Sequence, residues 1–185
     1  MTLSLTAGRA RVLFLCGDDV GGDMYNQDGT FSGVDASLAT AQLEVAQLAA
    51  ASSNLFVLEA SVTTSAAGVG DLTSLGVLRL VSVAQTDGSA PSTLRYDVPA
   101  VPTSVARSYN TPVALPLLVR YVALPTFPAD GGSDFVWGSA SITATALLDQ
   151  LMCLKAASEV KARENETNTV IERRIAPLTT TIKST

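Results

Sequence analysis

The residue types in this chain that could do chemistry are two cysteines and a group of aspartates. Cys16 and Cys153 lie far apart in the sequence, so they form no CxxC redox pair, and by themselves they cannot form a zinc site. A disulfide between them is one alternative. Two buried free thiols are favoured, because a free cysteine usually behaves as a small apolar residue. The 185 residues include no histidine, which excludes an imidazole base and a histidine metal ligand.

The aspartates are concentrated in residues 17–33, which hold four of them among five glycines: Asp18, Asp19, Asp23 and Asp28. Such a loop invites a calcium interpretation. An EF-hand, however, needs an acidic ligand at its first position and a glutamate at its twelfth, where this chain has Met24 and Asp35. The mismatch at both ends favours a solvated turn over a metal site.

Other catalytic patterns are also missing from the sequence. Nothing fits a P-loop, the glycines from 17 to 22 lack the spacing and the preceding strand of a dinucleotide motif, and there is no GxSxG nucleophile elbow. The adjacent carboxylates of Asp18 and Asp19 have no visible partner that would tune them for acid–base work. We therefore expect a protein that is not an enzyme and that holds no metal or cofactor.

The charge of the chain indicates which kinds of molecule it can bind. The chain has 12 basic and 17 acidic side chains, a net charge of −5 and an isoelectric point near 4.6, which argues against general affinity for nucleic acid. Residues 1–150 carry −7 and residues 151–185 carry +2. Only 16% of the residues are charged, against about 25% in an average chain. This predicts that a partner covers part of the surface.

Membrane and export signals are weak in this sequence. The most apolar run, residues 113–124, is interrupted by Pro116 and Arg120 and falls short of the roughly 18 residues that span a bilayer. The first charged residues follow the first apolar ones, unlike the order in a signal peptide. We expect a protein that is made in the cytoplasm and does not bind a membrane.

The first elements that would position these residues are two helices. An apolar stripe predicts a helix over residues 5–16, with Gly17 as its stop. A second helix is expected over residues 34–50, with Ser32 as its N-cap and Asp35 in its first turn. Its buried stripe follows spacings of three and four and leaves Gln42 and Gln47 outside; the stripe consists of Val34, Leu38, Ala41, Val45 and Leu48.

Residues 55–124 change to a β pattern. Strands are expected near residues 55–64, 75–84, 92–98 and 113–125, with a hairpin turn at Asp87-Gly88 and an irregular connection over residues 99–112. Val77 and Val83 are placed on one face of the second strand and Leu80 on the other. The proline at position 116 indicates that the last strand lies at a sheet edge. Together these strands predict one small antiparallel sheet.

A long helical stretch is expected from about residue 136 to residue 175, apolar first and charged later. Residues 165–169 could cap a new helix that ends before Pro177, and residues 176–185 read as an extended tail with no fixed structure of their own. Trp137 either anchors an interface or, as we favour, roots a helix in the core.

The predicted fold class is therefore α+β. It comprises a helical bundle of two N-terminal helices and the long C-terminal helices, with a small antiparallel β-sheet inserted in the middle. We expect a single domain over residues 1–175, followed by the extended C-terminal tail of residues 176–185.

This layout resembles the head-to-tail adaptor proteins, also called neck or connector proteins, of tailed bacteriophages. The resemblance covers most of the chain and is one of element order and texture rather than of an invariant motif. The β region of residues 55–124 is larger than such mostly helical adaptors lead us to expect. Four segments carry the likeness: GRARVLFLCGD (8–18), FSGVDASLATAQLEVAQLA (31–49), LPLLVRYVALPTFPADGGSDFVWGSASITATALLDQLMCLKA (115–156) and SEVKARENETNTVIERRI (158–175).

The resemblance implies a structural virion protein. Copies of it would form a homo-oligomeric ring, usually of about twelve, below the portal protein, where the ring joins capsid to tail and lines the DNA exit channel. Tail or nozzle proteins would dock beneath the ring, and genomic DNA would pass without specific binding. The C-terminal tail would insert into the portal through Ala176, Pro177, Leu178, Thr179, Thr180, Thr181, Ile182 and Lys183.

An acidic wall suits a conduit that DNA must slide past. The acids expected to face the lumen or the tail are Asp18, Asp19, Asp23 and Asp28, with the turn near Asp87 as a second place. Two alternatives remain open. One is another phage structural protein, such as a tail terminator, a collar or a tube protein. The other is a non-viral protein-binding module.

Overall fold

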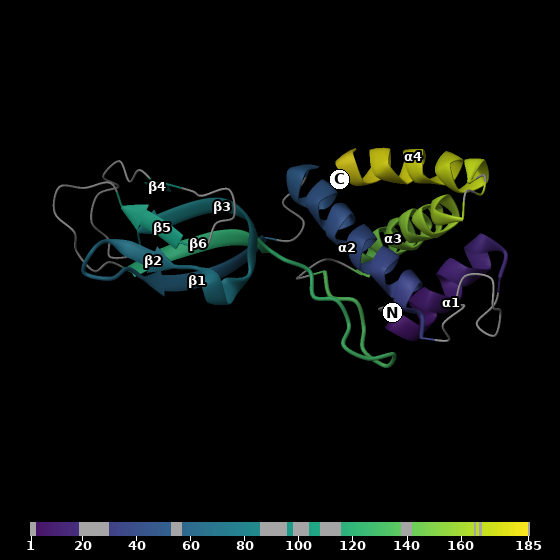
Figure 1. Cartoon of the computed structure of the whole chain (residues 1–185). Helices are drawn as coiled ribbons and strands as arrows, with labels where there is room; N and C mark the ends of the chain where they lie inside the picture. The colour runs from purple at the N-terminus through teal and green to yellow at the C-terminus, as the bar shows by residue number, and fades with distance from the viewer. Residues whose placement is uncertain are drawn as a thin grey trace. The chain divides into compact units, whose positions relative to one another are not determined.

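The chain forms two compact units in its computed structural model (Figure 1). The structure describes residues 3–18, 30–52, 57–85, 96–97, 104–107, 116–137, 142–164, 166 and 168–184. Met1–Leu55 and Pro125–Thr185 make the helical unit, and Phe56–Leu124 make the β unit. The inserted segment, which we expected within a single domain over residues 1–175, forms a compact unit with its own hydrophobic core.

In its described residues the β unit has two antiparallel three-stranded sheets, where we expected one. The first has the order β1 (Val57–Thr63), β6 (Pro116–Ala123), β3 (Val77–Gln85). The second has the order β2 (Val69–Asp71), β5 (Ser104–Arg107), β4 (Tyr96–Asp97). A short 3₁₀ turn, Thr73–Leu75, lies between β2 and β3. The first sheet covers a core of Leu72, Val77, Leu117, Val119 and Tyr121.

The last strand of the β unit is central, so the prediction of an edge strand at Pro116 is wrong. Pro116 is the first residue of β6 and lies opposite Thr63 of β1. A proline is tolerated at the first position of a strand, where the missing N–H costs the ladder least. Its side chains Leu117, Val119 and Tyr121 are apolar because they face the core.

Two irregularities in β3 overturn the predicted division of its faces. The pairing of β3 with β6 shifts between Val77 and Arg79 and again between Leu80 and Ser82. Each bulge breaks the alternation of side chains. As a result Leu80 joins Val77 and Val83 on the core side of the sheet.

Two other β predictions have mixed outcomes. Of the strand expected over residues 92–98, the structure describes only Tyr96–Asp97, and β5 forms within the segment expected to be an irregular connection. The hairpin turn at Asp87-Gly88 lies outside the described residues.

Helix α1 (Leu5–Cys16) begins and ends as its sequence predicts. The hydroxyl of Ser4 accepts a hydrogen bond from the N–H of Ala7 (3.3 Å) at its start. At its end Gly17 adopts a left-handed conformation with φ of 87°, and the N–H groups of Gly17 and Asp18 donate to the carbonyls of Phe14 and Leu13. Glycine is favoured there because it has no Cβ to clash.

Helix α2 (Ser32–Ser52) buries four of the five residues of the predicted stripe, Val34, Leu38, Ala41 and Val45, whereas the fifth, Leu48, is half-buried. The prediction that Gln42 lies outside the buried face of this helix is wrong. Its side chain is 2% exposed, and its Nε2 donates to the carbonyl oxygens of Thr126 (3.2 Å) and Val136 (3.5 Å). A buried amide is tolerated because these partners replace water.

The long helical stretch is divided into α3 (Ile142–Arg163) and α4 (Thr169–Ser184). The chain turns after α3, where the N–H groups of Glu164 and Glu166 both bond to the carbonyl of Lys161. The prediction of a new helix at residues 165–169 is confirmed at its start. The predicted end before Pro177 is wrong, since α4 continues through this proline.

The extended C-terminal tail is also contradicted. Residues 176–184 are the last turns of α4, and Ile182 is buried, 3% exposed. Pro177 lacks the N–H that would bond to the carbonyl of Arg173. The hydroxyls of Thr180 and Thr181 donate to the carbonyls of Ala176 and Pro177 (3.1 and 3.0 Å). The burial of Ile182 supports a helix that the local sequence disfavours.

The core of the helical unit is organised around α3, which packs against α1, α2 and α4. The buried face of α3 includes Leu148, Leu151, Met152, Ala156 and Val160. The α+β class is confirmed by these helices and the antiparallel sheets, whereas the bundle geometry stays a prediction. Among the described helices, none has the length and apolar character needed to cross a membrane.

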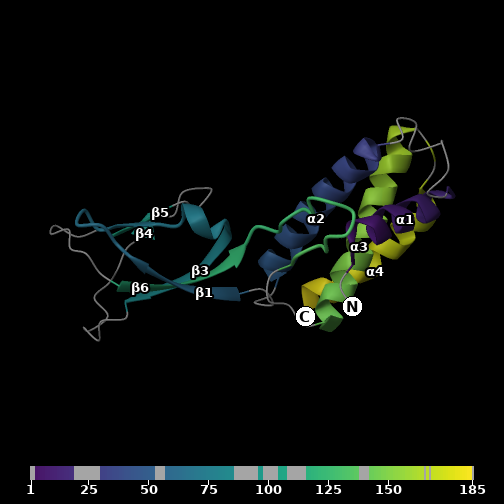
Figure 2. The ribbon, with the colours of Figure 1, turned by 90° about the horizontal axis from the view of Figure 1, so that it is seen from below.

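A non-helical segment, residues 125–137, folds back onto the start of α1, and we call it the arm (Figure 2). Its carbonyls at Gly131 and Ser133 accept hydrogen bonds from the N–H groups of Thr6 (3.1 Å) and Leu5 (2.9 Å). The ring of Phe135 packs so closely on Gly8 that a Cβ there would approach it to 2.9 Å. The arm is thus fixed to the helical unit.

Candidate functional site

A groove of about 500 Å³ lies between α2, α3 and α4 in the helical unit. Its walls are mainly polar and come from one face of each helix. The lining residues are Thr40, Ala41, Glu44, Lys155, Ser158, Glu159, Ala162, Asn168, Glu172 and Ile175.

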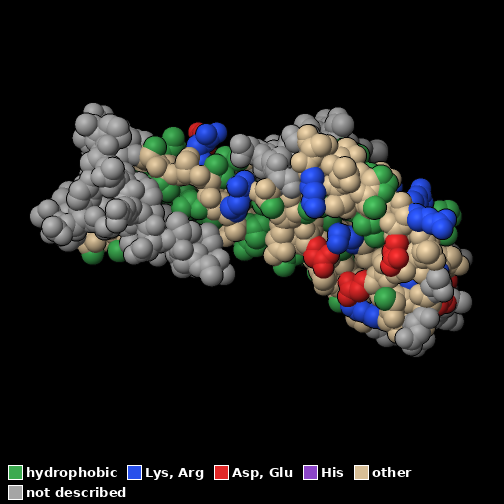
Figure 3. Space-filling view, turned by 90° about the horizontal axis from the view of Figure 1, so that it is seen from above, with side chains coloured by type: hydrophobic (Ala, Val, Ile, Leu, Met, Phe, Trp, Pro, Cys, Tyr) green, Lys and Arg blue, Asp and Glu red, His purple; other side chains and the backbone are tan. Residues whose placement is uncertain are grey.

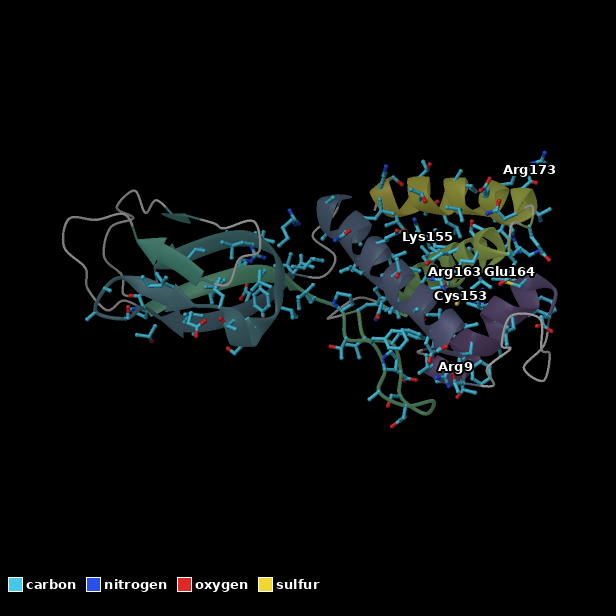
Figure 4. The ribbon with its side chains drawn as sticks, viewed as in Figure 1. Arg9, Cys153, Lys155, Arg163, Glu164 and Arg173 are labelled. Carbon is cyan, nitrogen blue, oxygen red and sulfur yellow. The ribbon has the colours of Figure 1, made fainter. Side chains whose placement is uncertain are left out.

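The charges in and around this groove are largely paired with one another. Lys155 Nζ lies 2.7 Å from Glu44 Oε2 and joins α3 to α2. Glu159 binds Arg163 one turn later in α3, at 2.5 Å. Figure 4 shows Lys155 and Arg163 along α3. Paired charges of this kind fix how helices pack, and they leave little unsatisfied charge for acid–base chemistry.

Asn168 fixes the entry of α4 beside the groove. Its Nδ2 donates to the hydroxyl of Ser158 (2.6 Å), and its backbone carbonyl accepts the N–H of Glu172 in the first turn of α4 (3.0 Å). The amide therefore links the start of α4 to α3. The segment containing Asn168 was predicted to cap this helix, and α4 does begin directly after it, at Thr169.

The outer side of α4 is the most exposed part of this region. Val170 is 73% exposed, and Phe14 of α1 is 78% exposed. Large exposed apolar side chains are typical of a partner-binding surface when several of them form one patch. Arg173 points away from the helical body (Figure 4). A space-filling view from above shows basic side chains at the end where α4 begins (Figure 3).

The two cysteines are buried free thiols, as predicted, and no disulfide joins them. Burial raises the pKa of the Cys16 thiol to about 11 and that of Cys153 to about 12. Cys16 Sγ lies 3.7 Å from the carbonyl oxygen of Ala157, its hydrogen-bond acceptor. A thiol is a nucleophile only as the thiolate, so both groups are packing residues at neutral pH.

Trp137 is buried in the core, as we favoured, but it belongs to the non-helical arm and not to the helix in which we expected it. It is 7% exposed, and its Nε1 donates to Asp149 Oδ1 at 2.7 Å. Asp149 is itself 4% exposed. Burial raises the pKa of this carboxyl, while the Trp137 N–H and the charge of Arg11 oppose the shift.

A bidentate ion pair joins α1 to α2, and sequence reasoning missed it. Arg9 donates from Nε and Nη2 to the two carboxylate oxygens of Asp35 (2.7 and 2.6 Å). The guanidinium also lies 4.9 Å from the centre of the Phe31 ring. Asp35 was expected in the first turn of α2, and that prediction is confirmed. Its ion pair with Arg9 depends on how α1 packs against α2, so the spacing of residues within one helix could not predict it.

The predicted functional residues are only partly brought together. Asp18 follows the end of α1, whereas Asp19, Asp23, Asp28 and Asp87 lie outside the described residues. Among the described residues, no group of three His, Cys, Asp or Glu side chains is placed to hold a metal ion. The predicted portal-binding residues share α4, with Leu178 half-buried and Ala176, Pro177, Thr180, Thr181 and Lys183 exposed.

A scan against protein-family models finds no matching family, and a search of curated protein sequences finds no relative.

Proposed function

We propose that this protein is a structural subunit of a phage neck, which assembles into a homo-oligomeric ring below the portal and joins capsid to tail. The observation that carries the proposal is the element order of the helical unit. Two N-terminal helices, α1 and α2, are followed by an inserted β unit and then by a long helix, α3, and a charged last helix, α4. This is the order on which the resemblance to head-to-tail adaptors rests.

The surface supports a role in assembly. Phe14 and Val170 expose most of their apolar area, and the groove beside α4 is lined by side chains that are paired with one another rather than poised for a reaction. A subunit of a permanent assembly uses such exposed apolar side chains for its contacts with other copies and with partners.

The portal would be met by residues 176–183 in this proposal. Because these residues are the last turns of α4, we propose contact through the exposed side of a helix, with Lys183 and Thr180 pointing outward, and no longer through an extended tail. Docking of this kind keeps Ile182 in the core.

The proposal is tested by counting copies of this chain in purified particles of the phage that encodes it, with isotope-labelled peptides as internal standards. A ring below the portal predicts about twelve copies per particle. About six copies would favour a terminator or a collar, and hundreds a tube protein. If the chain is missing from the particles, the proposal is wrong and a protein-binding module outside the virion becomes the better explanation.

A further inference from the structure

One face of the helical unit combines an exposed apolar side chain with free positive charge. We define the α4 face as Val170, Arg173 and Arg174. Arg173 and Arg174 form no ion pair with any residue in the described part of the chain, and α4 as a whole carries +2. Beside them is a hollow of about 160 Å³, lined by Leu15, Lys161, Asn168, Val170, Ile171 and Arg174.

A second face has the opposite charge. We define the arm face as Asp130, Asp134 and Val136. The arm contains these two acids and no Lys or Arg, so it carries −2. Three hydrogen bonds from Gly132 and Ser133 lower the pKa of Asp130, which therefore stays charged at neutral pH. Val136 is 51% exposed beside them.

These two faces lie on opposite sides of the helical unit. In Figure 1 α4 runs along the top and the arm hangs below α2, and in Figure 2, seen from below, the arm lies in front with α4 behind α3. They therefore cannot meet within one copy. Two complementary patches at opposite ends of a subunit generate a head-to-tail contact, which closes into a ring or continues as a filament.

We propose that the occupant of the α4 face is the arm face of a second copy of this chain. Val136 of one copy would enter the hollow beside Val170 of the next, while Asp130 and Asp134 would meet Arg173 and Arg174. The hollow suits one apolar side chain, since a cavity of about 150 Å³ holds a molecule of benzene. An apolar centre with a charged rim is the usual anatomy of such interfaces.

A second copy is favoured over an unrelated partner because both halves of the contact are present on the same chain, with matching net charges of +2 and −2. The inference rests on the proposed ring and names the surfaces that build it. The arm is suited to the task because its hydrogen bonds to Leu5 and Thr6 hold it in place before binding.

The test uses two variants of the full chain, each damaged on one face. Arg173→Glu with Arg174→Glu reverses the α4 face, and Val136→Asp places a charge at the centre of the arm face. Both sets of side chains are exposed, so the melting temperature should stay near that of the wild type. In native mass spectrometry the wild type should form oligomers, and each variant alone should show only the 19.1 kDa monomer.

Mixing the two variants gives the sharper result. The first variant keeps an intact arm face and the second keeps an intact α4 face, so one productive contact remains possible. We expect a heterodimer and no larger species. Arg120→Glu, a charge reversal in the β unit and outside both faces, is the matched control and should assemble as the wild type does. If Val136→Asp fails to fold, Val136→Ser replaces it.

Three outcomes would overturn this interface: a wild type that stays monomeric at every concentration, damaged variants that still assemble, or a mixture that gives no heterodimer. The particle count decides the proposed function separately. A chain present at about twelve copies whose damaged variants still assemble would keep the neck function and refute only these faces.

Discussion

At the scale of single residues, Asp149 is the side chain whose ionisation should change the stability of the fold. It is a carboxyl group buried in the core of the helical unit, and its oxygen accepts the Trp137 N–H at 2.7 Å. Burial without a full ion pair disfavours the charged form, and this is why the pKa of Asp149 is raised from 3.8. The folded protein therefore binds this proton more tightly than the unfolded chain does.

The pH dependence of unfolding should report that difference. The contribution of Asp149 to stability is complete below the unfolded pKa of 3.8 and is lost as the pH rises through the higher folded value. Asp149→Asn removes the titration. The free energy of unfolding of the wild type, minus that of the variant, should fall as the pH rises above 3.8. Trp137, the only tryptophan, provides the fluorescence signal for urea titrations.

Asp130→Asn serves as the control with the opposite sign. Hydrogen bonds from Ser133 and Gly132 lower the pKa of Asp130, so its contribution to stability should grow as the pH rises. If the difference for Asp149→Asn rises with pH as well, our assignment of a desolvated carboxyl is wrong.

At the scale of elements, α4 depends on the core more than its sequence suggests. Ile182 is buried in a stretch that otherwise has a proline and several threonines, which are poor helix formers. Ile182→Ala should lower the free energy of unfolding by about 2–5 kcal/mol, as is usual for loss of a buried isoleucine side chain. Deletion of residues 176–185 should destabilise the fold in the same direction.

Leu43→Ala on α2 is the matched control, because Leu43 is 39% exposed and its removal leaves no closed cavity. Chemical denaturation of both variants, followed by circular dichroism, checks the comparison. An Ile182→Ala variant as stable as Leu43→Ala would show that the end of α4 does not contribute to the core.

Elements that are determined by neighbouring residues in the sequence were predicted correctly, and those determined by tertiary contacts were not. Gly17 and the stripe of Val34 and Leu38 are local signals, and the helices that they predict are present. Pro177 was a local signal that tertiary contacts overrode. The bulges of β3 leave no mark in its apolar pattern, so the face of Leu80 could not be read from alternation.

The candidate site was less predictable than the helices. The exposure of Val170 and Phe14 depends on which helices pack beside them, and the partner of Gln42 comes from the arm, far along the chain. The charge excess of residues 151–185 was visible in the sequence. What it could not show is that Arg173 lies on the side of the unit opposite the acids of the arm.

At the scale of the whole molecule, the β unit should be dispensable for folding of the helical unit. Val57 and Val122 are paired across β1 and β6, so the chain enters and leaves the β unit at neighbouring points. Only five chain steps separate this pair from the two boundaries of the unit, so a connection between the boundaries has to span at most roughly 24 Å. Replacing residues 56–124 with a Gly-Ser linker of about eight residues, which reaches ~28 Å, bridges this gap.

The shortened chain should unfold cooperatively and keep the buried environment of Trp137. Fluorescence-monitored denaturation checks this. The same linker inserted after Leu43, within α2, is the control that should abolish folding. A shortened chain that binds hydrophobic dyes and melts without cooperativity would show that the helical unit needs the β unit.

The adjacency of Val57 and Val122 also matters for how such a gene can change over generations. Because the β unit is encoded as one uninterrupted stretch whose two boundaries meet in space, a single recombination event can remove it, lengthen it or exchange it for another small domain. The helical unit and both of the faces we assign to self-contact would be inherited intact. Selection could then act on the inserted module independently of the scaffold that carries it.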